Sequence, residues 1–153
     1  MNADPDGRAA SPTAAPAACL DIEWEPPPTT LLLEQDVVHV WRARFADFAG
    51  GVDRYRGVLA TDELARADRY HFSKPMRRFV IGRGLLRSLL SRYLGVAPGE
   101  IPLATNEHGK PHLVEAGQRW LRFNLAHSGE LLTFAFCQDR PVGIDLEGLR
   151  PLD

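Results

Sequence analysis

Hydrophobic residues recur with a helical period in the middle of the chain and alternate with polar residues toward its end. On a helix that begins near Ser73, one face carries Phe79, Gly82, Leu86, Leu89, Leu90 and Tyr93. Ser73 can cap this helix, and Pro75 is tolerated in its first turn. Gly95 follows the last apolar position and predicts the end of the helix.

Segments that are β-branched, aromatic or alternating predict strands. They span residues 37–41, 120–125, 131–138 and 142–147. Thr61 predicts the cap of a shorter helix that runs to about Tyr70, and Gly50-Gly51 marks a loop. Helices followed by a run of short antiparallel strands indicate an α+β fold.

The first 30 residues are predicted to be a disordered tail. Residues 1–18 are rich in Ala and Pro and carry almost no large apolar side chain. Such a segment cannot bury enough surface to offset its ordering entropy. Pro26, Pro27 and Pro28 add a stiff spacer, so we expect one folded domain over residues 31–153.

Composition narrows the class of protein. The chain has 153 residues, of which 44% are hydrophobic, and this is enough for one core. No apolar run approaches the roughly 18 residues of a membrane span, and no secretory signal is evident. Two cysteines favour a reducing, cytoplasmic setting. A net charge of −2 argues against nucleic acid and anionic membranes as partners.

The long helix is locally basic despite that balance. Residues 70–93 contain Lys74, Arg77, Arg78, Arg83, Arg87 and Arg92 but no Asp or Glu. This pattern suits a phosphate-bearing ligand or an acidic protein partner, although a solvated basic face is the more common case. Arg78 falls on the apolar face, so its guanidinium needs either an anionic partner or an escape route at the helix end.

Two carboxylates lie two residues apart in the last predicted strand. Side chains alternate along a strand, so Asp145 and Glu147 project from one side while Val142, Ile144 and Leu146 face a core. Carboxylates this close repel each other unless a cation or proton lies between them. Mg²⁺ prefers such oxygen ligands, but the spacing alone favours two solvated acids on an edge strand.

Two turns add further candidate residues. His127 and Ser128 follow a strand and precede Gly129, at an exposed position where ligands are commonly bound. A histidine without a ligand is the more common state, and adjacent Ser and His do not form a catalytic dyad. Lys110 follows Gly109 in a tight turn and can offer a point charge to phosphate.

Motifs in these segments follow one another in a specific order. Gly109-Lys110-Pro111 precedes the sequence F-N-L-A-H-S-G at 123–129 and V-G-I-D-L-E at 142–147. Residues 59–63, 69–70, 77–79 and 82–87 fit the same pattern. Together they resemble the surfactin-synthetase-activating type of 4′-phosphopantetheinyl transferase, over about residues 37–153.

The resemblance implies a reaction and a set of site residues. Members of this family transfer the phosphopantetheine arm of coenzyme A to a serine of a carrier protein, typically an acidic acyl or peptidyl carrier. The implied catalytic residues are Asp145, Glu147 and His127, with Asp145 and Glu147 holding Mg²⁺. Coenzyme A would be contacted by Arg66, Arg78, Arg83, Lys110 and His127.

The resemblance also implies half of a larger fold. Family members of this type have two similar halves with the active site between them, each a short antiparallel sheet packed with a long helix. Their second half carries a W-x-x-K-E motif, and this sequence has no Lys-Glu dipeptide. Ala126 also replaces a usual Ser or Thr, a lost hydroxyl contact of roughly 1 kcal/mol. We expect an incomplete transferase that needs a second half or a second copy.

Other classes of function remain open. A half-domain could bind coenzyme A or a carrier protein without catalysis. A metal-dependent nuclease built on Asp145 and Glu147 is less favoured, because Gly148-Leu149-Arg150 supplies no further acid or lysine.

Overall fold

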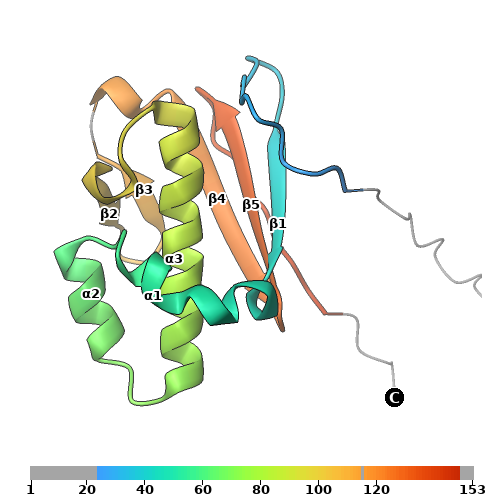
Figure 1. The fold of residues 1–153 in the computed structure, drawn as a ribbon. Helices are drawn as coiled ribbons and strands as arrows, with labels where there is room; N and C mark the ends of the chain where they lie inside the picture. Colours follow the sequence, from blue (N-terminus) through green and yellow to red (C-terminus); the bar gives the residue numbers. More distant parts are fainter. Residues whose placement is uncertain (1–23, 115, 149–153) are drawn as a thin grey trace, which may run out of the picture.

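A three-stranded antiparallel sheet and one long helix form the centre of the structure, a computed structural model that describes residues 24–114 and 116–148. The sheet has the strand order β1-β5-β4, and a separate hairpin pairs β2 with β3. The elements are β1 (His39–Arg44), the 3₁₀ helix η1 (Phe45–Gly51), α1 (Val52–Arg56), α2 (Thr61–Asp68), α3 (Ser73–Leu94), η2 (Pro98–Glu100), β2 (Leu103–Thr105), β3 (Pro111–Leu113), η3 (Ala116–Gln118), β4 (Leu121–Ser128) and β5 (Leu131–Gln138). All the α-helices lie on one side of the large sheet (Figure 1). The α+β class is confirmed.

The core lies between that side of the sheet and α3. The register aligns Phe136 with Phe123 and with His39, so alternate residues of the three strands share the inner face. Phe136 is fully buried, and its ring lies 4.8 Å from that of Tyr93 on α3. Burial of each such Phe or Leu stabilises the fold by about 1.5–3 kcal/mol.

Helix α3 is buried on more than the face that its period predicts. Leu86 and Leu90 pack toward the sheet, as expected, but Val80 and Gly84 are also buried, because α1 and α2 cover the opposite side. Gly95 ends the helix with a left-handed φ of 68°, which confirms the predicted stop.

Both predicted helix caps are off by one residue. The cap of α3 is Phe72 rather than Ser73, and that of α2 is Ala60 rather than Thr61. At α2 the Glu63 carboxylate accepts a hydrogen bond from the Ala60 backbone N–H at 2.9 Å, so a side chain three residues on supplies the capping group. The predicted Gly50-Gly51 loop is also wrong: η1 and α1 occupy this region.

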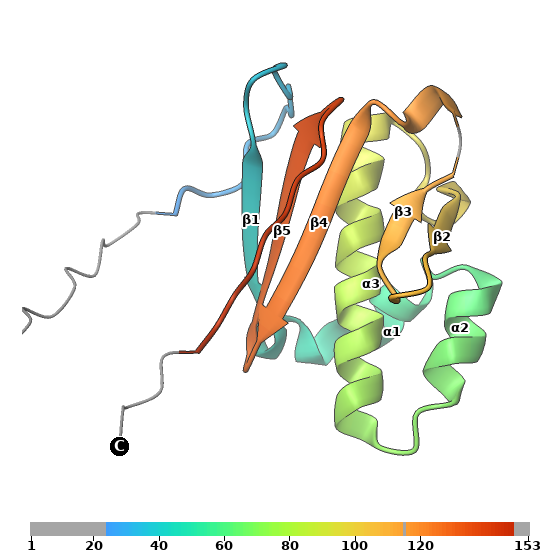
Figure 2. The same ribbon diagram turned by 180° about the vertical axis from the view of Figure 1, so that it is seen from behind.

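The prediction of a strand at 142–147 is wrong as well, although its alternation is present. The segment runs along the outer face of the sheet, away from α3, and joins no ladder (Figure 2). Val142, Ile144 and Leu146 are half-buried, whereas Asp145 and Glu147 are exposed. The Gly148 backbone N–H donates to Ser128 Oγ at 3.2 Å. The alternation of the segment therefore reflects packing on a sheet face rather than pairing at a sheet edge.

The described part of the N-terminal region has no helix or strand. Residues 24–30 are exposed, and the Trp24 ring lies 4.6 Å from the Arg42 guanidinium. The rest of the predicted tail, residues 1–23, lies outside the described residues. Within the described part, no helix is long and apolar enough to cross a bilayer.

Candidate anion-binding site

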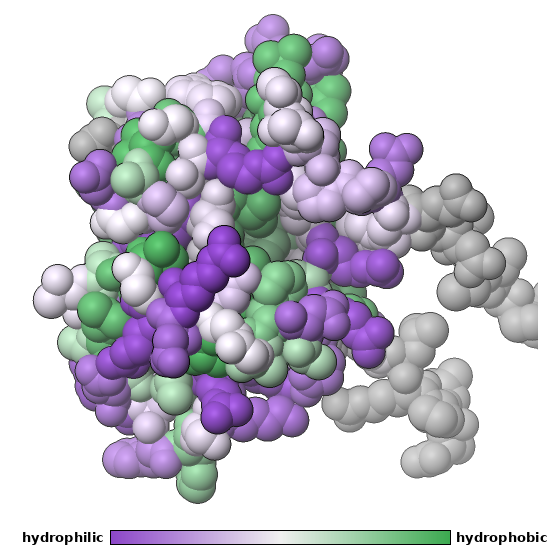
Figure 3. Space-filling model, in the orientation of Figure 1, coloured by the Kyte–Doolittle hydropathy of each residue, from purple (hydrophilic) through white to green (hydrophobic). Residues whose placement is uncertain are grey.

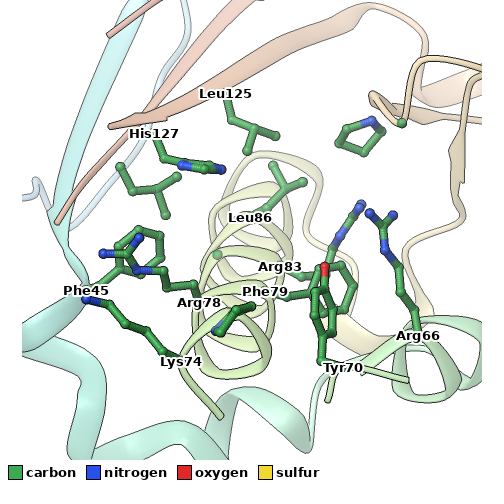
Figure 4. Close-up of a pocket in the computed structure, with 15 residues that line it drawn as sticks. Phe45, Arg66, Tyr70, Lys74, Arg78, Phe79, Arg83, Leu86, Leu125 and His127 are labelled. Atoms are coloured by element: carbon green, nitrogen blue, oxygen red, sulfur yellow. The ribbon is translucent and has the colours of Figure 1, made fainter. Parts of the chain in front are cut away.

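A cleft of about 490 Å³ opens beside the N-terminal half of α3. Its walls come from α2, α3, η1, the turn between β2 and β3, and the inner face of the large sheet (Figure 4). The Arg, Lys and His side chains that line it are Arg66, Lys74, Arg78, Arg83 and His127. No carboxylate is among the described lining residues. Figure 3 shows that hydrophilic and hydrophobic side chains are interspersed on the face of the molecule that Figure 1 presents.

Helical and strand periods bring these side chains together. Lys74 and Arg78 are four residues apart on α3, as are Phe79 and Arg83, so each pair shares one face of the helix. His127 and Leu125 are two residues apart on β4, so they share one face of the strand. Both side chains point from the sheet toward α3. The cleft is thus cationic where α3, α2 and β4 converge.

Arg78 has a protein carboxylate as its partner in this structure. Its Nη2 donates a hydrogen bond to Glu130, and Lys74 lies 3.4 Å from the same carboxylate oxygen. The guanidinium also lies 5.3 Å from the Phe45 ring centroid. The hydrogen bond from Arg78 holds the pKa of Glu130 below its ordinary value, with Lys74 acting in the same direction. Nothing in the local sequence pointed to Glu130.

A buried ion-pair network lies behind the cleft wall. Glu63, 5% exposed, contacts Arg87 Nε at 2.6 Å and Arg83 Nε at 3.4 Å. Arg87 also donates from Nη1 to the carbonyl oxygens of Pro98 and Ile101 at 2.7 and 3.0 Å. Burial lowers the pKa of the Arg83 guanidinium, and the charge of Glu63 opposes that effect. Two buried arginines therefore share one carboxylate, which leaves net positive charge at the wall.

Aromatic side chains stack beside these cations. The Phe79 ring centroid lies 4.9 Å from the Arg66 guanidinium and 5.8 Å from that of Arg83. The Tyr70 ring packs against Phe79 at 5.6 Å. Such contacts orient guanidinium groups without neutralising their charge.

Lys110 lies next to the cleft rather than in its wall. Asn106 Oδ1 accepts hydrogen bonds from the backbone N–H groups of His108 and Lys110 at 3.0 and 2.8 Å, which confirms the tight turn. Gly109 and Pro111 line the cleft, but the Lys110 side chain lines a separate hollow of about 260 Å³, together with Arg119 and Arg122.

Asp145 and Glu147 line neither hollow. Both are exposed on the segment that crosses the outer face of the sheet, and Asp145 Oδ1 accepts a hydrogen bond from the Leu146 backbone N–H at 2.8 Å. Among the described residues, no three His, Cys, Asp or Glu side chains are grouped to hold a metal ion. The two carboxylates fit Mg²⁺ only as part of a ligand set completed by other oxygens, such as phosphates.

The structure therefore gathers four of the seven residues expected at the site. Arg66, Arg78, Arg83 and His127 meet in the cleft, whereas Lys110, Asp145 and Glu147 do not. Lys74, Phe79 and Glu130 belong to the same surroundings but were not expected there. The sequence identified Lys74 as one of several basic residues on α3. Nothing in the sequence separated Lys74 from the basic residues that do not line the cleft.

Comparison with known sequences assigns the chain to a protein family. Residues 40–139 match the family described as 4′-phosphopantetheinyl transferase, N-terminal. The chain belongs to this family, in agreement with the motifs in its sequence.

Individual relatives support the assignment. The chain is 43% identical over 129 residues to the 4′-phosphopantetheinyl transferase HetI of Nostoc sp., an alignment that covers 84% of this chain and 54% of HetI. It is 28% identical over 100 residues to Sfp of Bacillus subtilis, covering 65% and 43% of the two chains. The chain thus spans about half the length of these curated relatives.

One solved structure shares the fold. A holo-(acyl-carrier-protein) synthase from Bacillus anthracis, crystallised with CoA (3′,5′-ADP), superposes with a TM-score of 0.53 at 19% identity. The match covers 65% of this chain and 91% of that one. This likeness shows the α+β fold.

Proposed function

We propose that the chain supplies the coenzyme A-binding half of a 4′-phosphopantetheinyl transferase. The transferase moves the phosphopantetheine arm of coenzyme A to a serine of an acyl or peptidyl carrier protein. The observation that carries this proposal is the cleft, where Arg66, Arg78, Arg83 and His127 surround an apolar floor and none of the described lining residues is a carboxylate. A ligand with several phosphates and an apolar portion fits that chemistry.

The binding roles follow from the charge and burial of each residue. Arg66 and Arg83 are held on the Phe79 ring and present their charge to an anion on the α2 side of the cleft. Arg78 and His127 lie on the side nearer the sheet and would contact a second phosphate. Lys110 would reach the ligand from the adjoining turn, since both its neighbours line the cleft.

In the proposed reaction the carrier serine oxygen attacks the β-phosphorus of coenzyme A. The bond from that phosphorus to the bridging oxygen breaks, 3′,5′-adenosine bisphosphate leaves, and the serine proton is lost to a base. The cleft cations stabilise charge that develops on the phosphate oxygens, and fixed positions supply most of the remaining acceleration. Mg²⁺ held by Asp145 and Glu147 would supply further charge neutralisation at the pyrophosphate.

A second candidate function is binding without transfer. Lys110, Asp145 and Glu147 lie outside the cleft, and the sequence has no Lys-Glu dipeptide of the kind that assists transfer in the family. A domain that binds coenzyme A or a carrier protein and depends on a second half for catalysis is consistent with this arrangement. A second copy of this chain could complete the site, which makes a homodimer part of the proposal.

The test is the intact mass of an apo carrier protein after incubation with this chain, coenzyme A and Mg²⁺. A mass gain of one phosphopantetheine means that the 153 residues suffice. Coenzyme A binding by calorimetry without a mass gain supports the binding half-domain. Absence of both results contradicts the proposed function. Arg66→Gln is the matched variant, because it removes one cleft cation outside the buried network.

A further inference from the structure

Glu130 lies where the two outer cations of the cleft meet. Its carboxylate is the partner of both Arg78 and Lys74, which line the cleft, although Glu130 itself is not a lining residue. The charge of Glu130 therefore neutralises part of a site that is otherwise cationic.

The backbone holds this carboxylate in position. Glu130 follows Gly129, whose φ of 56° turns the chain between β4 and β5. The Glu130 carbonyl oxygen accepts a hydrogen bond from the Phe45 backbone N–H at 2.9 Å, and this fixes the turn against η1. Glu130 thus acts as an anion tethered at the site, with a high effective concentration.

The contact is also one that an anion can replace. The Glu130 side chain is 48% exposed, so water can solvate it once it leaves. Arg78 still has unused hydrogen-bonding capacity, because its buried Nε has no partner among the described residues. An incoming phosphate oxygen would take over the bond from Nη2 without uncovering a buried group.

We propose that Glu130 is a specificity-determining residue that makes the cleft select diphosphates over single phosphates. A single phosphate must displace the Glu130 carboxylate, which is already tethered beside Lys74 and Arg78. The net gain in binding free energy for a single phosphate is therefore small. A diphosphate carries more charge and is also attracted by Arg66 and Arg83, which line the same cleft, so it displaces Glu130 with a net gain. The identity of the natural ligand rests on the proposed function, whereas the selectivity does not.

The experiment is a calorimetric titration with inorganic phosphate and with pyrophosphate, in EDTA and at fixed ionic strength. It uses the whole chain and its Glu130→Gln and Glu130→Asp variants. We expect the unaltered protein to bind pyrophosphate more tightly than phosphate. Glu130→Gln should raise phosphate affinity by about 3- to 10-fold, the scale of one or two exposed ion pairs, and pyrophosphate affinity by less. Glu130→Asp keeps the charge but shortens the reach, so it should show a smaller gain.

Glu100→Gln is the matched control. Glu100 is an exposed acid in η2, which follows the C-terminal end of α3 and lies outside the cleft lining. Glu100→Gln changes the net charge by the same amount as Glu130→Gln, but at a position outside the cleft. Its effect on the affinity for phosphate and for pyrophosphate should therefore be small and equal. Thermal unfolding of each variant checks that the fold is intact.

Three outcomes overturn the inference. They are equal effects of Glu130→Gln and Glu100→Gln, an unchanged ratio of the two affinities, and no anion binding by any variant. A parallel coenzyme A titration separates the two proposals. If coenzyme A fails to bind while Glu130→Gln narrows the phosphate–pyrophosphate selectivity, the proposed function fails and this inference stands. If coenzyme A binds and the selectivity does not change, the inference fails alone.

Discussion

Glu63 is the residue whose carboxylate balances the charge of two buried arginines. It contacts Arg83 and Arg87 and caps α2 through the Ala60 N–H. We predict that Glu63→Gln lowers the free energy of unfolding by about 3–5 kcal/mol, because it leaves two buried guanidiniums without an anion. Urea denaturation measures the loss. Asp62→Asn, at the exposed neighbouring position, should change stability by under about 0.5 kcal/mol; equal losses would contradict the assignment.

At the same scale, Glu130 offers a test by titration. Its pKa is lowered chiefly by the hydrogen bond from Arg78. A carboxyl whose pKa is depressed by folding adds stability above its unfolded-state pKa, and that stability is lost as pH falls through the folded-state pKa. We predict that an NMR titration finds the Glu130 pKa below its ordinary value and that Arg78→Gln moves it back upward. An unchanged pKa in that variant would mean that Arg78 is not the partner in solution.

At the scale of elements, the packing of α1 on α3 depends on one missing side chain. A Cβ on Gly84 would lie 2.6 Å from Tyr55 Cβ and 3.0 Å from its Cα, whereas a Cβ on Gly82 would meet Leu132 Cδ2 at an ordinary 3.7 Å. We predict that Gly84→Ala destabilises the fold by about 1–3 kcal/mol through overpacking. Gly82→Ala should be neutral or stabilising by up to about 1 kcal/mol, because it gains helix propensity without a clash. Thermal unfolding compares the two variants, and a smaller loss at Gly84 than at Gly82 would disprove the close approach.

The sequence correctly predicted the elements that depend on residues within a few positions of one another. Residues 131–138 form β5 as predicted, and Gly95 ends α3, since alternation and a left-handed glycine act within a few residues. The segment 142–147 alternates in the same way, yet it lies across a sheet face, a choice that its own sequence does not encode.

The same difference between local and long-range causes separates the site residues that the sequence predicted from those that it did not. The basic face of α3 was visible in the sequence because it has a helical period. Glu63 and Glu130 were not, because each pairs with residues at least 20 positions away, and such a partner is defined only by the fold. Arg78 illustrates the difference: its need for an anion followed from its position, but the identity of that anion did not.

At the scale of the whole molecule, the cations expected to bind coenzyme A and the two carboxylates expected to bind Mg²⁺ lie on different sides of the sheet. Arg66, Arg78 and Arg83 line the cleft on the α3 side, whereas Asp145 and Glu147 lie on the segment that covers the outer face (Figure 2). Anion binding and metal binding should therefore be separable by mutation. The two carboxylates are exposed and have no third described acid beside them, so Mg²⁺ alone should bind weakly.

We predict that Mg²⁺ tightens coenzyme A binding by the unaltered chain and that the Asp145→Asn/Glu147→Gln double variant loses this gain. In EDTA the double variant should keep its coenzyme A affinity within about twofold, because neither carboxylate lines the cleft. Arg78→Gln should instead weaken binding by about 3- to 10-fold with or without Mg²⁺, since it removes a cleft cation. Calorimetry with the unaltered chain and both variants, each in Mg²⁺ and in EDTA, measures the six affinities. A double variant that loses affinity in EDTA as severely as Arg78→Gln would mean that the carboxylate segment moves into the cleft when coenzyme A binds.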